Sequence, residues 1–475
     1  MPTLMGLPNE ILTAIIEATE PDDIESFSTC CKLMYSLARH RLEEHKQKKS
    51  LYSTVSVSDY ALLYPEPFQG EEFNTQLQGL FLDKRNRLYT KTMAVEFFAH
   101  FAAEMSAVND LGGFEQQLES SMTEVHNKIG LDTGGIEANE WSKDVKGGNT
   151  SATLLLLLAF LPNLENVSIE FSTFWSLRLS AGYSKILSLM TKASLKQSKN
   201  ELSFGGRLSK CTVHGDGFEA LEEGILPFLM MLPRIQVFQG YGLSIEDSYS
   251  WPYADAVSPV VDLELHGEVE AFTLSGYLCG IRELKRFRYT HDGDHVLGRY
   301  IPFKPCEIIA TLREFAFRSL VDLDFTIDAS IQMSWSIDLP GIGSLRSFEV
   351  LETIRLQYIL LFQEARVANS ADIVNLAQTS EDLCDEPKIR GQKLIDFLPS
   401  SARTFRLEDI AERRLVLELF KGFPEHRVER LPKLEVISLH AGDQINTKIE
   451  KICRRSGVRW RSGKKISVFC GTSEG

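Results

Sequence analysis

The stretch Leu161–Ile169, with the sequence LPNLENVSI, carries the pattern that decides the fold. It follows an apolar helix-like run at a Leu-Pro corner, and its hydrophobic and polar residues then alternate as in a half-buried strand. Leu431–Leu439, with the sequence LPKLEVISL, repeats the same arrangement near the other end of the chain. A unit of helix, corner and strand therefore recurs, which predicts an α/β fold.

Weaker copies of this unit lie between and around these two stretches. We expect their strands in the segments 208–213, 232–238, 260–265, 281–287, 312–317, 351–356 and 398–407. Strands that alternate with helices pair in parallel through right-handed crossovers. One helix–strand unit cannot cover its own apolar face, so neighbouring units must stack. The pattern predicts an irregular solenoid with parallel strands on its concave side and helices on its convex side. The uneven spacing leaves open a non-repetitive α/β domain with similar corners.

The segments around the first copy have weaker patterns. We expect a strand within Leu77–Leu82, an amphipathic helix over Met93–Met105 and another over Phe114–Lys128. Paired glycines and polar residues predict a loop insertion at about 130–150. After the last copy, we expect a terminal helix from Asn446 to Arg455 and one more strand.

The N-terminal stretch Leu7–Lys49 predicts a small helical module. Pro8 suits a helix start, and apolar residues then recur on one helical face, as they do again after Glu20-Pro21. These two stripes are Ile11, Leu12, Ile15 and Ile16, followed by Ile24, Phe27, Cys31, Met34 and Ala38. So short a module buries little surface on its own and needs a partner or a following domain. We therefore expect two parts, a helical module at 1–49 and a solenoid at 50–475.

The module resembles an F-box, through which adaptor subunits of cullin-type ubiquitin ligases dock onto the Skp linker protein. The resemblance rests on Leu7-Pro8, Glu10-Ile11-Leu12 and the later series Ile24, Phe27, Cys30-Cys31-Lys32 and Leu37-Ala38. Two residues depart from the pattern: Tyr35 stands where the family often has Trp or Phe, and Cys30 replaces the usual aliphatic residue. The alternating stretch Leu51–Val57 follows directly, as in fungal-type F-box proteins with degenerate leucine-rich repeats. The alternative is an ordinary amphipathic helix at a globular N-terminus.

The resemblance implies a function and a docking site. The chain would be the substrate-recognition adaptor of an SCF ubiquitin ligase, with a client protein on its repeats and no catalytic residue or cofactor of its own. The residues that would bind the Skp linker protein are Leu7, Pro8, Glu10, Ile11, Leu12, Ile15, Ile24 and Phe27. The alternative is a repeat-based scaffold that binds proteins without ubiquitin transfer, with the helices as an N-terminal cap.

Composition narrows the classes of function. A formal net charge of −14 disfavours general binding to nucleic acid. The longest apolar run, Leu154–Leu161, is far shorter than the roughly twenty residues that span a bilayer. The eight cysteines contain no CxxC pair, which favours reduced thiols. We therefore expect an intracellular protein of the cytoplasm or nucleus that binds neither membranes nor nucleic acid.

Two polar clusters remain as candidate sites. The segment His291–His295 carries two imidazoles and two carboxylates, but its central glycine favours a turn over a metal site, and we expect no metal. An enzyme that uses this segment is a third alternative. The basic C-terminal end, with Arg454, Arg455, Arg459 and Arg461, is either a solvated cap or a surface for an acidic or phosphorylated client segment. Four earlier arginines would extend such a surface: Arg403, Arg406, Arg413 and Arg414.

Overall fold

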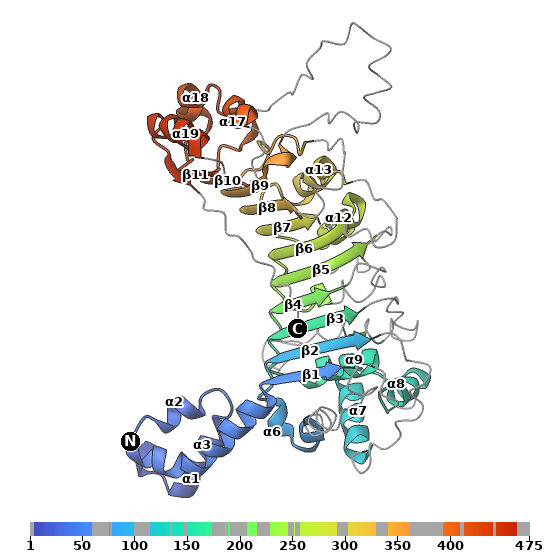
Figure 1. Cartoon of the computed structure of the whole chain (residues 1–475). Helices are drawn as coiled ribbons and strands as arrows, with labels where there is room; N and C mark the ends of the chain where they lie inside the picture. The colour runs from blue at the N-terminus through green and yellow to red at the C-terminus, as the bar shows by residue number, and fades with distance from the viewer. Residues whose placement is uncertain are drawn as a thin grey trace, which may run out of the picture. The chain divides into compact units, whose positions relative to one another are not determined.

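The chain divides into two compact units. Figure 1 labels their strands and helices. The computed structural model describes residues 4–58, 76, 78–98, 115–132, 135–146, 150–172, 186, 189–190, 207–215, 229–245, 251, 257–291, 303–328, 341–361, 393–408, 413–439 and 443–462. The first unit contains residues 1–216 and 222–236, and the second contains residues 217–221 and 237–475. The boundary expected between residues 49 and 50 therefore falls inside the first unit.

The first unit starts with helices and continues into a parallel sheet. Its helices are η1 (Leu4–Gly6), α1 (Asn9–Ala18), α2 (Ile24–Ser28), α3 (Lys32–Tyr52), α6 (Lys84–Arg87), α7 (Glu115–Ile129), α8 (Ile136–Lys146) and α9 (Thr150–Phe160). Its strands are β1 (Thr54–Ser58), β2 (Thr92–Phe98), β3 (Asn166–Ser172) and β4 (Lys210–His214). Each strand pairs in parallel with the next one along the chain.

The second unit continues the same plan with eight strands in its described residues. They are β5 (Val237–Ile245), β6 (Asp262–Val269), β7 (Arg286–His291), β8 (Asp322–Ile327), β9 (Thr353–Gln357), β10 (Thr404–Glu408), β11 (Val436–Leu439) and β12 (Arg459–Ser462). Its helices are α12 (Ala271–Leu278), α13 (Pro305–Ala316), η4 (Tyr358–Leu360), α16 (Leu394–Phe397), α17 (Arg413–Leu419), α18 (Phe423–Arg430) and α19 (Asp443–Arg455). Strands β5 to β12 are parallel neighbours in chain order. The predicted parallel α/β architecture is confirmed.

One backbone contact repeats at the start of nearly every strand. The carbonyl before one strand accepts hydrogen bonds from two consecutive N–H groups at the start of the next. The accepting carbonyls belong to Ser53, Lys91, Glu165, Val261, Lys285, Val321, Glu352 and Arg403. For example, the carbonyl of Arg403 accepts from the N–H groups of Glu435 and Val436, at 2.8 and 3.0 Å. The corner of each unit is thus built alike, although the chain between corners varies greatly in length.

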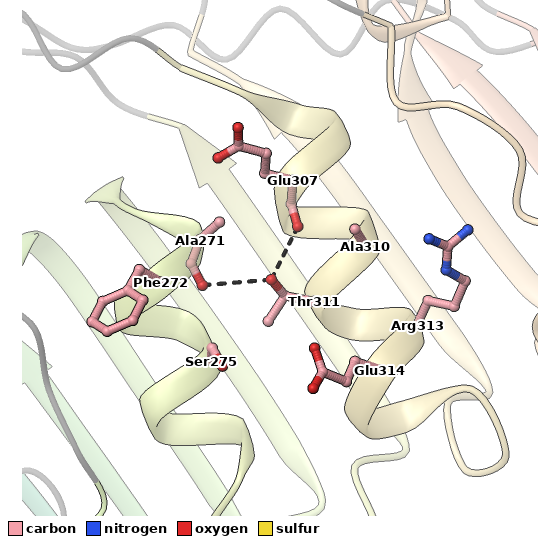
Figure 2. A pocket seen from close by; sticks show the side chains of 8 residues that line it. All are labelled: Ala271, Phe272, Ser275, Glu307, Ala310, Thr311, Arg313 and Glu314. Carbon is pink, nitrogen blue, oxygen red and sulfur yellow. Dashed lines mark hydrogen bonds between the residues drawn. The ribbon is translucent and has the colours of Figure 1, made fainter.

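Alternating burial along each strand forms the core. In β7, β8 and β9 side chains are buried at every second position. The buried side chains include Phe287, Phe325 and Ile354, which are fully buried. The intervening side chains are polar and partly exposed. The strands of each unit therefore have one apolar face against the helices and one polar face, which we call the open face. In Figure 2, α12 and α13 lie over one face of the sheet.

Four expectations from sequence are wrong. The stretch 312–317 is the end of α13, and the strand of that unit is β8, a few residues later. Residues 78–82 are helical and β2 occupies the first part of the expected helix, so the two elements are exchanged there, while 99–105 lie outside the described residues. The loop insertion expected at about 130–150 contains α8. There, Ala138, Trp141 and Val145 are buried at helical spacing between the two glycine pairs.

Candidate docking surfaces

The N-terminal module has a closed core of its own. The buried cluster is formed by Leu12, Ile16, Ile24, Met34, Ala38 and Leu42, and the residues packed against it are Leu7, Phe27, Cys31 and Leu37. Of the residues expected to bind a partner, Leu12 and Ile24 are therefore core residues. Leu7, Ile15 and Phe27 are partly buried, whereas Pro8, Glu10 and Ile11 are exposed.

Large apolar side chains remain exposed outside this core. We call this set the module surface: Leu4, Met5, Ile11, Leu33 and Tyr35. It contains five of the eleven large hydrophobic side chains that are exposed in the described residues. Met5 and Cys31 are in contact, with their sulfur atoms 3.8 Å apart, which brings η1 to the start of α3. Concentration of exposed apolar side chains on one small module is typical of a protein–protein interface.

The module is joined to the first sheet directly. Helix α3 ends at Tyr52, and β1 begins two residues later. His45 is buried at this joint, where its Nδ1 lies 3.1 Å from Tyr89 Oη and its Nε2 lies 3.2 Å from Glu25 Oε1. These contacts connect α3 to α2 and to the segment before β2.

Charged pairs strengthen the same joint. Asp22 lies between Arg207, at 3.0 Å, and Lys91, at 3.5 Å, both near the starts of strands. The hydrogen bond from Arg207 lowers the pKa of Asp22, so the carboxylate stays charged. Lys48 of α3 contacts Asp83 at 3.3 Å. The module is thus connected to the sheet of its own unit at several points.

The open faces of the two units differ in chemistry. In the first unit, the described residues of this face are mostly small and uncharged. Its rows across β1 to β4 begin with Thr54, Thr92, Asn166 and Lys210, and continue with Ser56, Ala94, Ser168 and Thr212. In the second unit, the register places charged side chains in rows across the strands. The central row is Gln239, Glu264, Arg288, Asp324, Arg355, Arg406, Ser438 and Arg461.

Ion pairs join neighbouring members of this central row on β6 and β7 and again on β8 and β9. Arg288 contacts Glu264 at 2.6 Å, and Arg355 contacts Asp324 at 2.9 Å. Burial works against the charged form of Glu264, but hydrogen bonds from His266 and Gln239 lower its pKa overall. Because the sign of the charge alternates from one strand to the next in this row, most of the charges are compensated within the face.

Asp322 and Asp324 are exceptions, because burial raises the pKa of both carboxyl groups. Asp322 gives a pH-dependent prediction. Burial raises the pKa of Asp322, and this effect exceeds the opposing effect of Arg288 and Arg286. Stability from this group is therefore present below the unfolded pKa, about 3.9, and is lost as the pH rises through the folded value. Asp322→Asn is expected to raise Tm at pH 7 and to leave it unchanged near pH 3, in thermal unfolding monitored by circular dichroism.

The matched control for this prediction is Asp262→Asn. Asp262 accepts hydrogen bonds from Arg286 and Arg288, so its replacement is expected to lower Tm at pH 7. A lower Tm at pH 7 in both variants would contradict the assignment of Asp322 as a destabilising charge.

A pocket of about 540 Å³ lies between α12 and α13 on the helical side of the second unit (Figure 2). It is lined by Ala271, Phe272, Ser275, Glu307, Ala310, Thr311, Arg313 and Glu314. The hydroxyl of Thr311 donates to the carbonyl of Glu307 at 3.0 Å and reaches that of Ala271 at 3.5 Å, which links the two helices. The lining contains neither His nor Cys, the side chains most used for catalysis near neutral pH. Its charged side chains are the carboxylates Glu307 and Glu314 and the guanidinium of Arg313.

The candidate clusters from the sequence are only partly placed. His291 is buried, stacked on Phe303 with ring centroids 3.9 Å apart, while 292–295 lie outside the described residues. Arg454 and Arg455 lie on α19, whereas Arg459 and Arg461 lie two residues apart on β12. The four arginines thus do not form one surface. Sequence reasoning named Arg406 as an extension of the basic end but missed Ser438, and only the strand register brings both into the same row as Arg461.

Comparisons with known proteins leave the family open. Neither the models of known protein families nor the curated proteins contain a match to this chain. In the described residues, no helix combines the length and the apolar character needed to cross a bilayer.

Proposed function

We propose that this chain is the substrate-recognition adaptor of a cullin-based SCF ubiquitin ligase. The N-terminal module is an F-box that docks onto the Skp linker protein, and the parallel strands with their helices form a leucine-rich-repeat-like solenoid that binds a client protein. The observation that carries the proposal is the module surface, an exposed apolar set on a module whose own core is complete.

The exposed residues favour docking over other roles for the module. Ile11 is 48% exposed and Tyr35 is 53% exposed, although both belong to helices that bury their other faces. Large side chains of this kind supply most of the binding energy of protein interfaces. Leu7 and Pro8, which begin the F-box-like motif, lie next to this set in the chain.

The joint between module and sheet fits the same function. An adaptor accelerates transfer by proximity, because it raises the concentration of client lysines near the ubiquitin-loaded enzyme. A flexible connection would reduce this effect. The direct passage from α3 into β1, with the buried His45 contacts, limits that flexibility. The adaptor itself needs no catalytic residue.

The second candidate function is a repeat-based scaffold without ubiquitin transfer. It treats the helices as a cap, which would bury Ile11 and Ile15 against the rest of the chain. Ile11 is exposed and Ile15 is only partly buried, so the adaptor is favoured.

Reconstitution distinguishes the two functions. The wild-type chain is mixed with purified Skp linker protein, cullin, its RING subunit and the ubiquitin-conjugating cascade. An adaptor is expected to co-elute with the linker and cullin in size-exclusion chromatography and to become ubiquitylated on its own lysines. A folded chain that elutes alone and stays unmodified would favour the scaffold.

A further inference from the structure

The alternation of charge on the open face ends between β9 and β10. In the central row, Glu264, Arg288, Asp324 and Arg355 alternate in sign, but Arg406 follows directly opposite Arg355. Like charges at directly opposite positions are unfavourable unless an anion compensates them. Ser438 and Arg461 complete the row on β11 and β12, so this end of the face carries an excess of positive charge.

The carboxylates near this end are already shared. Glu408 contacts both Arg355, at 2.8 Å, and Arg406 Nε, at 2.7 Å. Glu435 contacts Arg459 at 3.2 Å and Arg403 at 3.5 Å. No carboxylate lies in the central row between Arg406 and Arg461.

Three donors therefore remain available along a short line. Among the described residues, the terminal nitrogens of Arg406, the guanidinium of Arg461 and the hydroxyl of Ser438 have no hydrogen-bond partner. The three residues occupy the same register position on neighbouring strands. Since strands are about 4.8 Å apart, the two arginine Cα atoms lie roughly 10 Å apart, with Ser438 between them.

We infer that Arg406, Ser438 and Arg461 bind a phosphorylated serine or threonine of a client protein. Two guanidinium forks can converge on one phosphoryl group over the hydroxyl, which matches a group with three acceptor oxygens and nearly two negative charges. A carboxylate has one acceptor oxygen fewer than the phosphoryl group and about half its charge, so it matches the two guanidinium groups less well. The inference rests on the proposed function, because it gives the client of the adaptor its recognition chemistry.

The charge of the remaining chain makes such a site selective. With a formal net charge of −14, the protein repels polyanions in general, so a local basic row favours a small anionic group. The row also lies on the face opposite the helices, where Arg406 keeps 37% of its side chain exposed. A peptide can therefore lie across β10 to β12 and place its phosphate in the row.

The test is fluorescence polarisation of the full-length chain with a pool of short peptides that carry a central phosphoserine between randomised flanks. The same pool without phosphate is the reference. We expect phosphate-dependent binding that Arg406→Gln with Arg461→Gln weakens at least about tenfold. Arg454→Gln with Arg455→Gln removes the same charge from exposed positions on α19 and is expected to change affinity less than about twofold.

A second variant keeps the test decisive if the double variant is poorly folded. Ser438→Glu places a carboxylate between the two arginines, so it is expected to raise Tm and to abolish phosphopeptide binding. Equal loss in both double-arginine variants, or no phosphate dependence up to millimolar peptide, would overturn the inference. Binding to vesicles with phosphatidylinositol bisphosphate, but not to the peptides, would overturn it in favour of a lipid surface.

The same proteins separate this inference from the proposed function. The variants at Arg406 and Arg461 are expected to bind the Skp linker protein as the wild type does. If the chain binds the linker protein but not the phosphopeptides, the adaptor function is supported and its client site lies elsewhere. If the chain binds the phosphopeptides but not the linker protein, the adaptor function is contradicted and the phosphate site is supported.

Discussion

Ile11→Asp is expected to weaken binding to the Skp linker protein at least about a hundredfold. Ile11 is exposed on α1, so its replacement removes an apolar anchor and introduces a charge that the complex would have to bury. Because the side chain lies outside the module core, Tm and the far-ultraviolet circular dichroism are expected to stay unchanged. Isothermal titration of the linker protein into both chains measures the effect.

The matched control is Val428→Asp. Val428 lies on α18 and is 72% exposed, so the same change of charge falls on a surface that the proposal does not use. This variant is expected to bind the linker protein like the wild type. Equal affinity of Ile11→Asp and wild type would show that α1 is not a docking helix.

The second large effect concerns the alternation of faces along β10. Phe405 is fully buried, whereas its neighbour Arg406 lies on the open face. Phe405→Ala is expected to lower the free energy of unfolding of the second unit by about 3–5 kcal/mol. Arg406→Ala, on the next residue, is expected to cost less than about 1 kcal/mol.

Urea denaturation measures this difference. The chain has two units, so the transition of the second unit must be resolved from that of the first before a free energy is assigned. A larger loss of stability in Arg406→Ala than in Phe405→Ala would mean that the faces of β10 are exchanged, and the central row would then be wrong.

The sequence predicted the strands best where a corner precedes a clear alternation. The stretches 161–169 and 431–439 led to β3 and β11, and even the faint segments 208–213 and 260–265 led to β4 and β6. The stretch 312–317 failed for a physical reason. Its leucine and phenylalanines follow helical spacing from Ile308 and Ile309, which are buried in α13.

The wrong assignments around β2, where a strand was expected before it and a helix in its place, have a similar cause. In Met93–Met105, the first residues alternate, with Met93 and Val95 buried, but the longer window also fits a helix. Short apolar runs cannot be assigned by periodicity alone, and here the parallel pairing with β1 and β3 decides for a strand.

The candidate sites were predictable only in part. The apolar stripe of the module was visible in the sequence, but its division into core and surface needed the packing of α1 against α3, which buries Leu12 and exposes Ile11. The sequence pointed to Arg406 and Arg461 as basic residues, but it could not show that they share a row with Ser438, because long segments separate β10, β11 and β12 and register is a property of the folded sheet.

Titration of the wild-type chain with purified Skp linker protein tests the central claim most directly. The adaptor is expected to form a one-to-one complex with a dissociation constant below about 1 µM, as specific interfaces with buried apolar anchors do. A folded chain that shows no binding at roughly a hundred times that concentration would contradict the adaptor function.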